Sequence, residues 1–230
     1  MRFREALVVM AKVPVSGEVK TRLTPPFSPN EAAELFRCFF LDAMELARRV
    51  KNSDVVLCYT ADDALDAFPV SGISGSECIP QGEGDLGARM RRAFETLLDR
   101  GYSKVVLIGT DMPTLPLDYI EEAFTLLDEH PVVLGPAMDG GYYLLGLRTM
   151  IPEIFDGIDW RTSQVLQQTS ERLVRRDIQP VCLLPWYDVD NAAEVDFLVA
   201  HLDLLQIRES VRLPLHTVDY LHRLGLLPRR

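Results

Sequence analysis

Short apolar runs alternate with longer stretches of helical period, and this alternation most limits what the chain can fold into. The apolar runs span residues 6–10, 54–60, 77–79, 104–109, 132–134, 142–147 and 181–184. The helical stretches span residues 28–50, 86–98, 163–175 and 192–204, and a further helix is expected from about Pro116. Strands that alternate with helices form βαβ units around a parallel sheet. We therefore expect an α/β fold with a mostly parallel sheet.

Two local signals refine this prediction. Only a short turn around residues 139–141 separates two of the apolar runs, whereas a parallel crossover needs a dozen or more residues. These two strands are therefore expected to be antiparallel, which makes the sheet mixed. The best-marked helix start is Ser28, with Pro29 at the first helical position and Glu31 placed to complete a capping box.

The length and composition indicate one domain. A chain of 230 residues with 47% hydrophobic content can bury one substantial core, so we expect a single nucleotide-binding domain over residues 1–230. Residues 206–230 have a weaker pattern. They are expected to form a C-terminal extension that packs either on the domain or on a second subunit, as in a homodimer.

The net charge and the short first apolar run argue against several classes of partner. A formal net charge of -10 argues against a nucleic-acid partner, because such interfaces need a basic surface. The first apolar run is too short for a secretory signal or a membrane span, so we expect a cytoplasmic protein with a small-molecule ligand. The cysteines, Cys38, Cys58, Cys78 and Cys182, include no close pair, and they are expected to be buried, reduced thiols.

The loop after the first apolar run is long and carries several cations. It contains Lys12, Gly17, Lys20 and Arg22, and it lies where open α/β sheets bind ligands. Gly17 allows close backbone approach, while Lys20 is a point charge and Arg22 a forked donor for phosphoryl oxygens. A solvated charged loop without a ligand explains the same residues equally well, because their spacing matches no P-loop.

Two carboxylate positions follow predicted strands and are candidate metal ligands. Asp111 comes directly after the strand at residues 104–109, and Asp188 and Asp190 follow the last strand. Mg²⁺ takes one or two protein carboxylates and completes its shell with water and substrate phosphates. The alternative at both Asp111 and Asp190 is helix capping, since a helix is expected shortly after each of them.

A tight turn and a nearby tryptophan are candidates for binding a second substrate. Asp139, Gly140, Gly141 and Tyr142 form a turn whose glycines permit close ligand approach, but an ordinary hairpin turn would look the same. Trp160 either stacks on a ligand or belongs to the core.

The segment after the third predicted strand is rich in glycine. Gln81, Gly84 and Gly87 occur there, just before a predicted helix. Main-chain groups in such a segment can read the edge of a nucleobase. A flexible connection is the alternative.

Together these segments resemble the nucleotide-diphospho-sugar transferase superfamily with the A-type glycosyltransferase fold. The resemblance is greatest to an uncharacterised bacterial family related to molybdenum-cofactor and phospholactate guanylyltransferases, and it covers about residues 7–205. It is carried by the series from Lys12 to Leu23, GTDMP at 109–113, DGGY at 139–142 and DVD at 188–190. It implies a three-layer α/β/α sandwich with a mostly parallel mixed sheet of Rossmann-like type. Met10, Ala11 and Lys12 replace the glycine doublet of the nucleotidyltransferases, so the base and reaction class stay open.

The resemblance also implies roles for the candidate residues. Lys20 and Arg22 would hold a triphosphate in the loop that includes Lys12 and Gly17, and Gln81, Gly84 and Gly87 would border the base. Asp111 would bind Mg²⁺ or Mn²⁺, assisted by Asp190, which makes Lys20, Arg22 and Asp111 the catalytic candidates. A small acceptor would bind at Asp139, Gly140, Gly141, Tyr142 and Trp160.

Three functions are compatible with these residues. In nucleotidyl transfer, an acceptor attacks the α-phosphate of a nucleoside triphosphate and pyrophosphate leaves. In glycosyl transfer, a nucleotide sugar is the donor and a base such as Asp139 activates the acceptor hydroxyl. The third is a nucleotide-binding regulator without turnover, which has less need of two metal-binding carboxylates beside a cationic loop.

Overall fold

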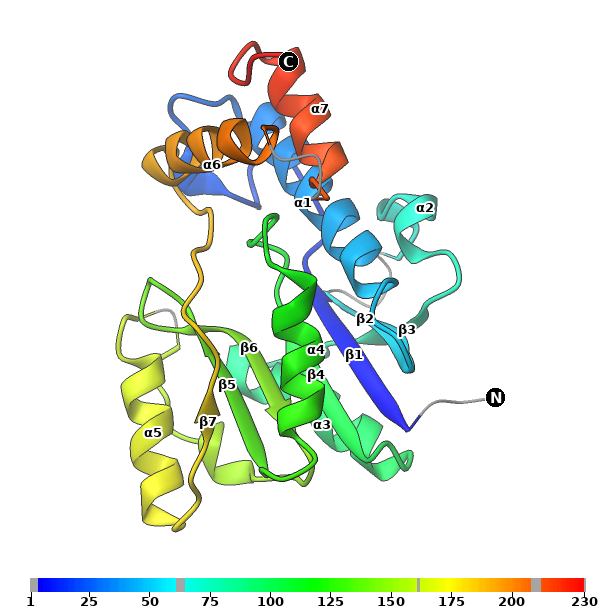
Figure 1. Cartoon of the computed structure of the whole chain (residues 1–230), viewed down its shortest axis with the longest axis vertical. Helices are drawn as coiled ribbons and strands as arrows, with labels where there is room; N and C mark the ends of the chain where they lie inside the picture. The colour runs from blue at the N-terminus through cyan, green and yellow to red at the C-terminus, as the bar shows by residue number, and fades with distance from the viewer. Residues whose placement is uncertain (1–3, 61–64, 161, 208–211, 230) are drawn as a thin grey trace.

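A seven-stranded mixed sheet forms the centre of the part of the chain that the computed structural model describes, residues 4–60, 65–160, 162–207 and 212–229. Its order is β3-β2-β1-β4-β6-β5-β7 (Figure 1). The strands are β1 (Glu5–Ala11), β2 (Ser53–Tyr59), β3 (Glu77–Pro80), β4 (Lys104–Ile108), β5 (Val132–Pro136), β6 (Tyr142–Leu147) and β7 (Val181–Cys182). Only β6 runs antiparallel to its neighbours, β4 and β5. The prediction of a mixed sheet with one antiparallel pair is confirmed.

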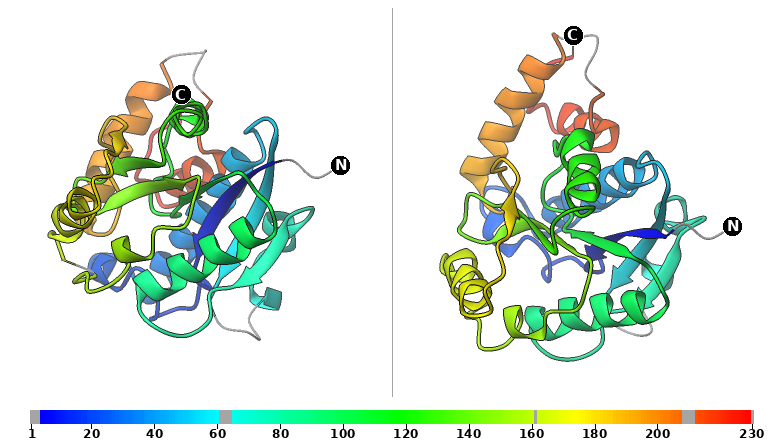
Figure 2. Two further views of the ribbon diagram at one scale, coloured as in Figure 1. Left: turned by 90° about the horizontal axis from the view of Figure 1, so that it is seen from below. Right: turned by 60° about the horizontal axis from the view of Figure 1, so that its bottom comes forward.

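Helices cover both faces of the sheet, which gives three layers (Figure 2). One face carries α1 (Pro29–Ala47) and α4 (Leu117–Leu126), with the short α2 (Val70–Ile73) packed beside α1. The other face carries α3 (Leu86–Asp99) and α5 (Val165–Arg175). Successive residues of β1 point to opposite faces, so Leu7 and Val9 pack in the first core and Ala6 and Val8 in the second. The predicted α/β/α sandwich is confirmed.

The helix α1 begins as its sequence indicates. The side chain of Ser28 accepts a hydrogen bond from the backbone N–H of Glu31, and the Glu31 carboxylate accepts one from the N–H of Ser28. Apolar residues occupy two sides of this helix: Phe40 and Met44 face the sheet core, while Phe39 packs in a third core. The third core joins α1 to α6 (Ala192–Leu205) and α7 (Leu215–Arg223), which lie together near the top of Figure 1.

A buried carboxylate fixes α7 on α1. Asp42 is only 5% exposed, and it accepts hydrogen bonds from the backbone N–H groups of His216 and Thr217 and from the Thr217 hydroxyl, at 3.0, 2.8 and 2.6 Å. The first N–H groups of a helix have no partner within the helix, so a carboxylate at this position both caps α7 and complements its dipole. Burial raises the pKa of Asp42 to about 6, although these hydrogen bonds act in the opposite direction.

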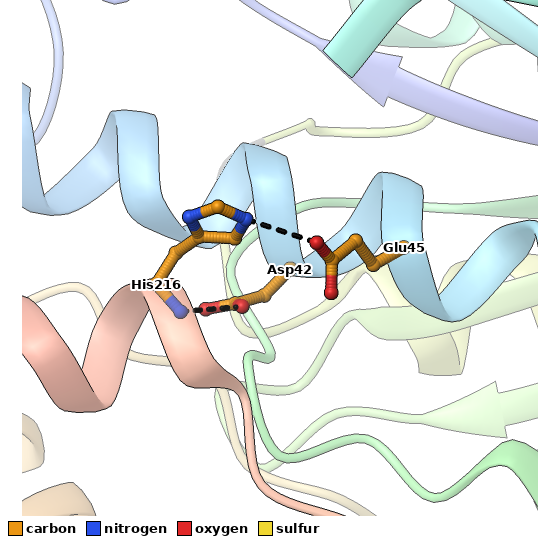
Figure 3. Close-up of side chains that lie close together, drawn as sticks. All are labelled: Asp42, Glu45 and His216. Carbon is orange, nitrogen blue, oxygen red and sulfur yellow. Dashed lines mark hydrogen bonds and ion pairs between the residues drawn. The ribbon is translucent and has the colours of Figure 1, made fainter. Parts of the chain in front are cut away.

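The same contact gathers a group of potential metal ligands. Figure 3 shows Asp42 and Glu45 on α1 facing His216 on α7. Both carboxylate oxygens of Asp42 already accept hydrogen bonds from α7, and His216 Nε2 lies 3.1 Å from Glu45 Oε1. These partners account for the cluster as a helix-docking contact.

Some expectations about exposure were wrong. Cys38 and Cys58 are buried, but Cys78 is half-buried and Cys182 is exposed, because Cys182 lies on the edge strand β7, where one face has no cover. No helix in the described ranges is long and apolar enough to cross a membrane. Residues 208–211 and 230 of the predicted C-terminal extension lie outside the described residues.

Replacement of Asp42 should separate the docking role from a metal-binding role. Asp42→Ala leaves two buried N–H groups of α7 unpaired, so we expect the free energy of unfolding to fall by about 2 to 4 kcal/mol. The control is Glu45→Ala on the same helix; the Glu45 side chain is 46% exposed, and its loss should cost less than about 1 kcal/mol. Urea denaturation measures both. Equal losses in the two variants, together with destabilisation by a chelator, would contradict the docking role.

Candidate functional site

The side chain of Lys20 brings three distant segments together at the carboxyl edge of the sheet. Its Nζ lies 2.7 Å from Asp111 Oδ1, 2.6 Å from Asp190 Oδ1 and 2.7 Å from the carbonyl oxygen of Val189. Asp111 follows β4, and Asp190 immediately precedes the cap of α6. The backbone N–H of Val189 also donates to the Asp111 carbonyl at 2.9 Å, which fixes the two aspartate segments side by side.

Two buried anchors direct Lys20 inward. Val19 packs against α1 with Phe36, and Leu23 packs in the third core. Lys20 between them adopts a left-handed backbone conformation with φ 49° at the start of the single 3-10 turn Thr21–Leu23. Its side chain is only 5% exposed, and Nζ lies 5.9 Å from the ring centroid of Phe36.

Ion pairs keep this buried amine charged. Burial alone lowers the pKa of Lys20, but the carboxylates of Asp111 and Asp190 outweigh it, so the pKa is raised. An ammonium group has three N–H donors, and three oxygen atoms lie within hydrogen-bonding distance of Nζ. In this conformation Lys20 is therefore committed to protein oxygens, whereas the family resemblance assigns it to a triphosphate.

The alternative roles of the two aspartates as helix caps are wrong. The N-cap of α4 is Pro116, which has no side-chain capping bond. The N-cap of α6 is Asn191, which forms a capping box with Glu194. Asp111 and Asp190 are thus left to face Lys20.

The rest of the cationic loop is open to solvent. Lys12 and Gly17 are exposed, and Gly17 has φ 80° with no atom within 4 Å of the position of a Cβ. The Arg22 side chain is 76% exposed, with its nearest guanidinium nitrogen 3.8 Å from Asp190 Oδ2. At that distance and exposure the pair binds weakly, so Arg22 is free to turn to a ligand.

The glycine-rich segment is fixed by strand ends and by α3. Gln81 is 4% exposed, and its side-chain nitrogen donates to the carbonyls of Ala11 and Cys58, at the ends of β1 and β2. Both N–H groups of this amide are thus engaged. The guanidinium of Arg92 donates to the carbonyls of Gln81 and Glu83. These hydrogen bonds tie the start of the segment to β1, β2 and α3, which favours a fixed connection over a flexible one.

The turn after β5 is an ordered structural turn at the start of α5. Asp139 Oδ1 accepts a hydrogen bond from the N–H of Gly141, and the carbonyl of Gly140 accepts one from Leu166 in α5. Gly140 has φ 92°, and a Cβ there would meet the carbonyl oxygen of Ser163 at 2.3 Å. The requirement for glycine is therefore explained by packing.

The two aromatic residues of this region are partly buried. The Tyr142 hydroxyl is buried, and this burial raises its pKa more than the neighbouring Thr169 hydroxyl lowers it. Trp160 packs edge-on against Tyr142, with ring centroids 6.4 Å apart. Its indole also lies against Gly87, where a Cβ would be 2.3 Å from Trp160 Nε1. Trp160 thus links the glycine-rich segment to the turn at 139–142.

A pocket of about 530 Å³ lies beside this tryptophan. It is lined by the N-cap of α3 and by the segment before α5: Asp85, Ile158, Asp159, Trp160, Thr162, Ser163 and Gln164. Of the predicted site residues, Trp160 lines this pocket, together with Asp85 from the glycine-rich segment.

One feature of the site was not among the predicted site residues. The carbonyl of Val189 is a third oxygen partner, and a main-chain atom leaves no signal in the sequence. Asp188 was a candidate carboxylate beside Asp190, and burial, then the charge of Asp139, raise its pKa to about 6. Its alternation with Asp190 was visible in the sequence, but its closeness to Asp139 was not.

The oxygen atoms around Lys20 also suit a hard divalent cation. Two carboxylate oxygens and one carbonyl oxygen lie 2.6 to 2.7 Å from a single cationic centre. Such oxygens are the ligands that Mg²⁺ and Mn²⁺ favour, and the ammonium marks a position where a positive charge is stable.

A characterised enzyme is among the sequence relatives. The chain is 27% identical over 206 residues to 2-phospho-L-lactate guanylyltransferase of Methanothermobacter thermautotrophicus, a match that covers 88% of this chain and 89% of that enzyme.

Solved structures of the same fold agree with the sheet described above. A candidate nucleotide-diphospho-sugar transferase of Desulfovibrio desulfuricans G20 has a TM-score of 0.85 and 31% identity, covering 98% of this chain and 96% of that one. A protein of Mycobacterium tuberculosis H37Rv, solved in complex with manganese, has a TM-score of 0.54 and 14% identity, covering 87% of this chain and 100% of that one.

The family assignment rests on a match of residues 43–162, just over half of the chain, to a family described as "Uncharacterized protein conserved in bacteria (DUF2064)". The chain belongs to this family, within the nucleotide-diphospho-sugar transferase superfamily.

Proposed function

We propose that this protein is a nucleotidyltransferase that uses Mg²⁺ or Mn²⁺ to move a nucleoside monophosphate from a triphosphate to a small acceptor, with release of pyrophosphate. The observation that carries the proposal is the convergence of Asp111, Asp190 and the Val189 carbonyl on one cationic position at the carboxyl edge of the sheet. The guanylyltransferase relative supports the reaction class.

The site residues divide into a metal-binding group and a phosphate-binding group. Asp111 and Asp190 hold the cation, which neutralises phosphoryl oxygens when it is bound. Arg22 and Lys12, both exposed on the loop after β1, pair with the triphosphate, and Gly17 lets the backbone approach it. The reason for this division is exposure: the Lys20 side chain is buried against the two aspartates, whereas Arg22 and Lys12 are open to a ligand.

The two substrates bind at neighbouring segments of the carboxyl edge. The segment from Gln81 to Gly87 borders the nucleobase, and the relative's name makes guanosine triphosphate the first donor to test. The acceptor approaches past the turn at 139–142 and the pocket beside Trp160. A small phosphorylated acid is the acceptor class that fits the same relative.

The chemical step needs no side-chain nucleophile. An acceptor oxygen attacks the α-phosphorus in line with the leaving pyrophosphate, and the residues of the site position both groups and stabilise the developing charge. Glycosyl transfer is the second candidate, since a structure at 31% identity is described as a nucleotide-diphospho-sugar transferase. Identification of the released product, pyrophosphate or a nucleoside diphosphate, decides between them.

Asp111→Asn should abolish metal-dependent turnover while the protein stays folded. The Asp111 side chain is 39% exposed and asparagine keeps an oxygen for Lys20, so the thermal unfolding temperature should change little. Loss of a metal-binding carboxylate should lower kcat/KM by about 100-fold or more. Pyrophosphate release from guanosine triphosphate in the presence of candidate acceptors measures it.

Asp139→Asn is the matched control for that variant. Asparagine keeps the oxygen that accepts from Gly141, and Asp139 lies on the acceptor side, so metal-dependent triphosphate binding should stay at the wild-type level. Wild-type metal dependence in Asp111→Asn, or equal losses of triphosphate binding in both variants, would contradict the assignment of the metal site.

Gly87→Ala should disturb the site through Trp160. The added methyl group would lie 2.3 Å from the indole nitrogen, so the indole has to move, and kcat/KM should fall by about 10- to 100-fold. Alanine is a better helix former than glycine in α3, so a loss of helix propensity cannot explain a defect. A double-mutant cycle with Trp160→Leu tests the cause: Gly87→Ala should have little further effect once the indole is gone. Full additivity would refute this explanation.

A further inference from the structure

The ammonium group of Lys20 occupies the place where the proposed metal ion would bind. Its Nζ is 2.7 Å from Asp111 Oδ1 and 2.6 Å from Asp190 Oδ1, and the Val189 carbonyl is a third partner at 2.7 Å. A metal ion bound by these three oxygen atoms would take the position of Nζ. A divalent ion and an ammonium group cannot occupy that position together, because like charges repel strongly at such short distances.

We propose that the metal ion enters this site by exchange with Lys20, which then moves to the phosphates of the triphosphate. This inference rests on the proposed function. Lys20 therefore holds the two carboxylates in position before substrate binds, and it becomes a phosphate ligand afterwards. The buried lysine of the structure and the phosphate-binding lysine that the family resemblance implies are two states of one side chain.

The loop that carries Lys20 is suited to such a movement. Lys20 has a left-handed backbone conformation, φ 49°, which non-glycine residues seldom adopt without compensation from their surroundings. Here the compensation is the pair of ionic contacts, which a metal ion would take over. Val19 and Leu23 stay buried on either side of Lys20, so the exchange moves its side chain and displaces little of the core.

The exchange makes metal binding and triphosphate binding cooperative. Without a triphosphate, the ammonium competes for the carboxylates and lowers the affinity for a divalent ion. With a triphosphate, the ammonium has other anionic partners, so the metal site becomes free. By linkage, the metal must raise the affinity for the triphosphate by the same factor. The enzyme would then bind the metal–nucleotide complex in preference to either component.

Manganese binding by Lys20→Met tests the competition directly. Methionine fills a similar space beside the rings of Phe36 and Phe39, near which Nζ lies, but removes the charge. In the absence of any nucleotide, Mn²⁺ should bind the variant at least about tenfold more tightly than the wild type, as measured by electron paramagnetic resonance titration. Wild-type or weaker affinity in a folded variant would overturn the exchange.

Three further variants test whether a change in Mn²⁺ affinity is specific to Lys20 and to the two aspartates. Arg22→Met removes a cation from the same loop whose side chain is 76% exposed, so it should change Mn²⁺ affinity far less. Adding Asp190→Asn to Lys20→Met should abolish the increase in Mn²⁺ affinity. Asp111→Asn tests the proposed function separately: if it binds Mn²⁺ as the wild type does, the metal site itself is wrong, whatever Lys20 does.

The exchange can also be tested in the wild-type protein, by measuring how accessible the Lys20 amine is. Amine acetylation followed by mass spectrometry reports how accessible Lys20 is, and the internal control is Lys104, which is 12% exposed and is paired with Glu5, Asp128 and the Phe124 carbonyl. Mn²⁺ alone should increase labelling of Lys20 several-fold and leave Lys104 unchanged. Lys20 labelling that is unchanged or reduced by saturating Mn²⁺ would overturn the proposal.

Discussion

The ionic contact between Lys20 and the two aspartates organises the carboxyl edge of the sheet. It joins the loop after β1, the end of β4 and the segment before α6, across up to 170 positions in the sequence. A buried ammonium without partners would be strongly destabilising, and each aspartate would repel the other without the ammonium. The three charges therefore stabilise one another, and any cation that replaces Lys20 must restore the same balance.

The third core makes this convergence possible. Leu23 and Val189 are both buried in it, next to Lys20 and Asp190 respectively, while α6 and α7 pack on the outer side of α1. The segment that matches the family, residues 43–162, contains Asp111, the glycine-rich segment and Trp160, but neither Lys20 nor Asp190. Segments on either side of the matched region thus supply Lys20 and Asp190, and the matched region contributes Asp111.

Local signals predicted the fold well because strands and helix starts are encoded locally. The Ser28 capping box, the antiparallel pair β5–β6 and the position of Asp111 after β4 all follow from neighbouring residues. Long-range partners left no such signal: Asp42 lies within an apolar stretch of α1, and its partner Thr217 is 175 positions away. The burial of Lys20 is of the same kind, because the sequence shows its charge but not the aspartates that fold against it.

The acidic residues of the site determine which form of a triphosphate a protein with a net charge of -10 can bind. Asp139 and Asp190 lie close enough to Asp188 that burial, then the charge of Asp139 and that of Asp190, raise the pKa of Asp188 to about 6. A free triphosphate would be repelled by these carboxylates, whereas a triphosphate that brings a divalent cation supplies the missing positive charge. Selection for the metal complex thus arises from the carboxylates themselves. Without the metal complex, Lys20 supplies part of the same positive charge and neutralises Asp111 and Asp190.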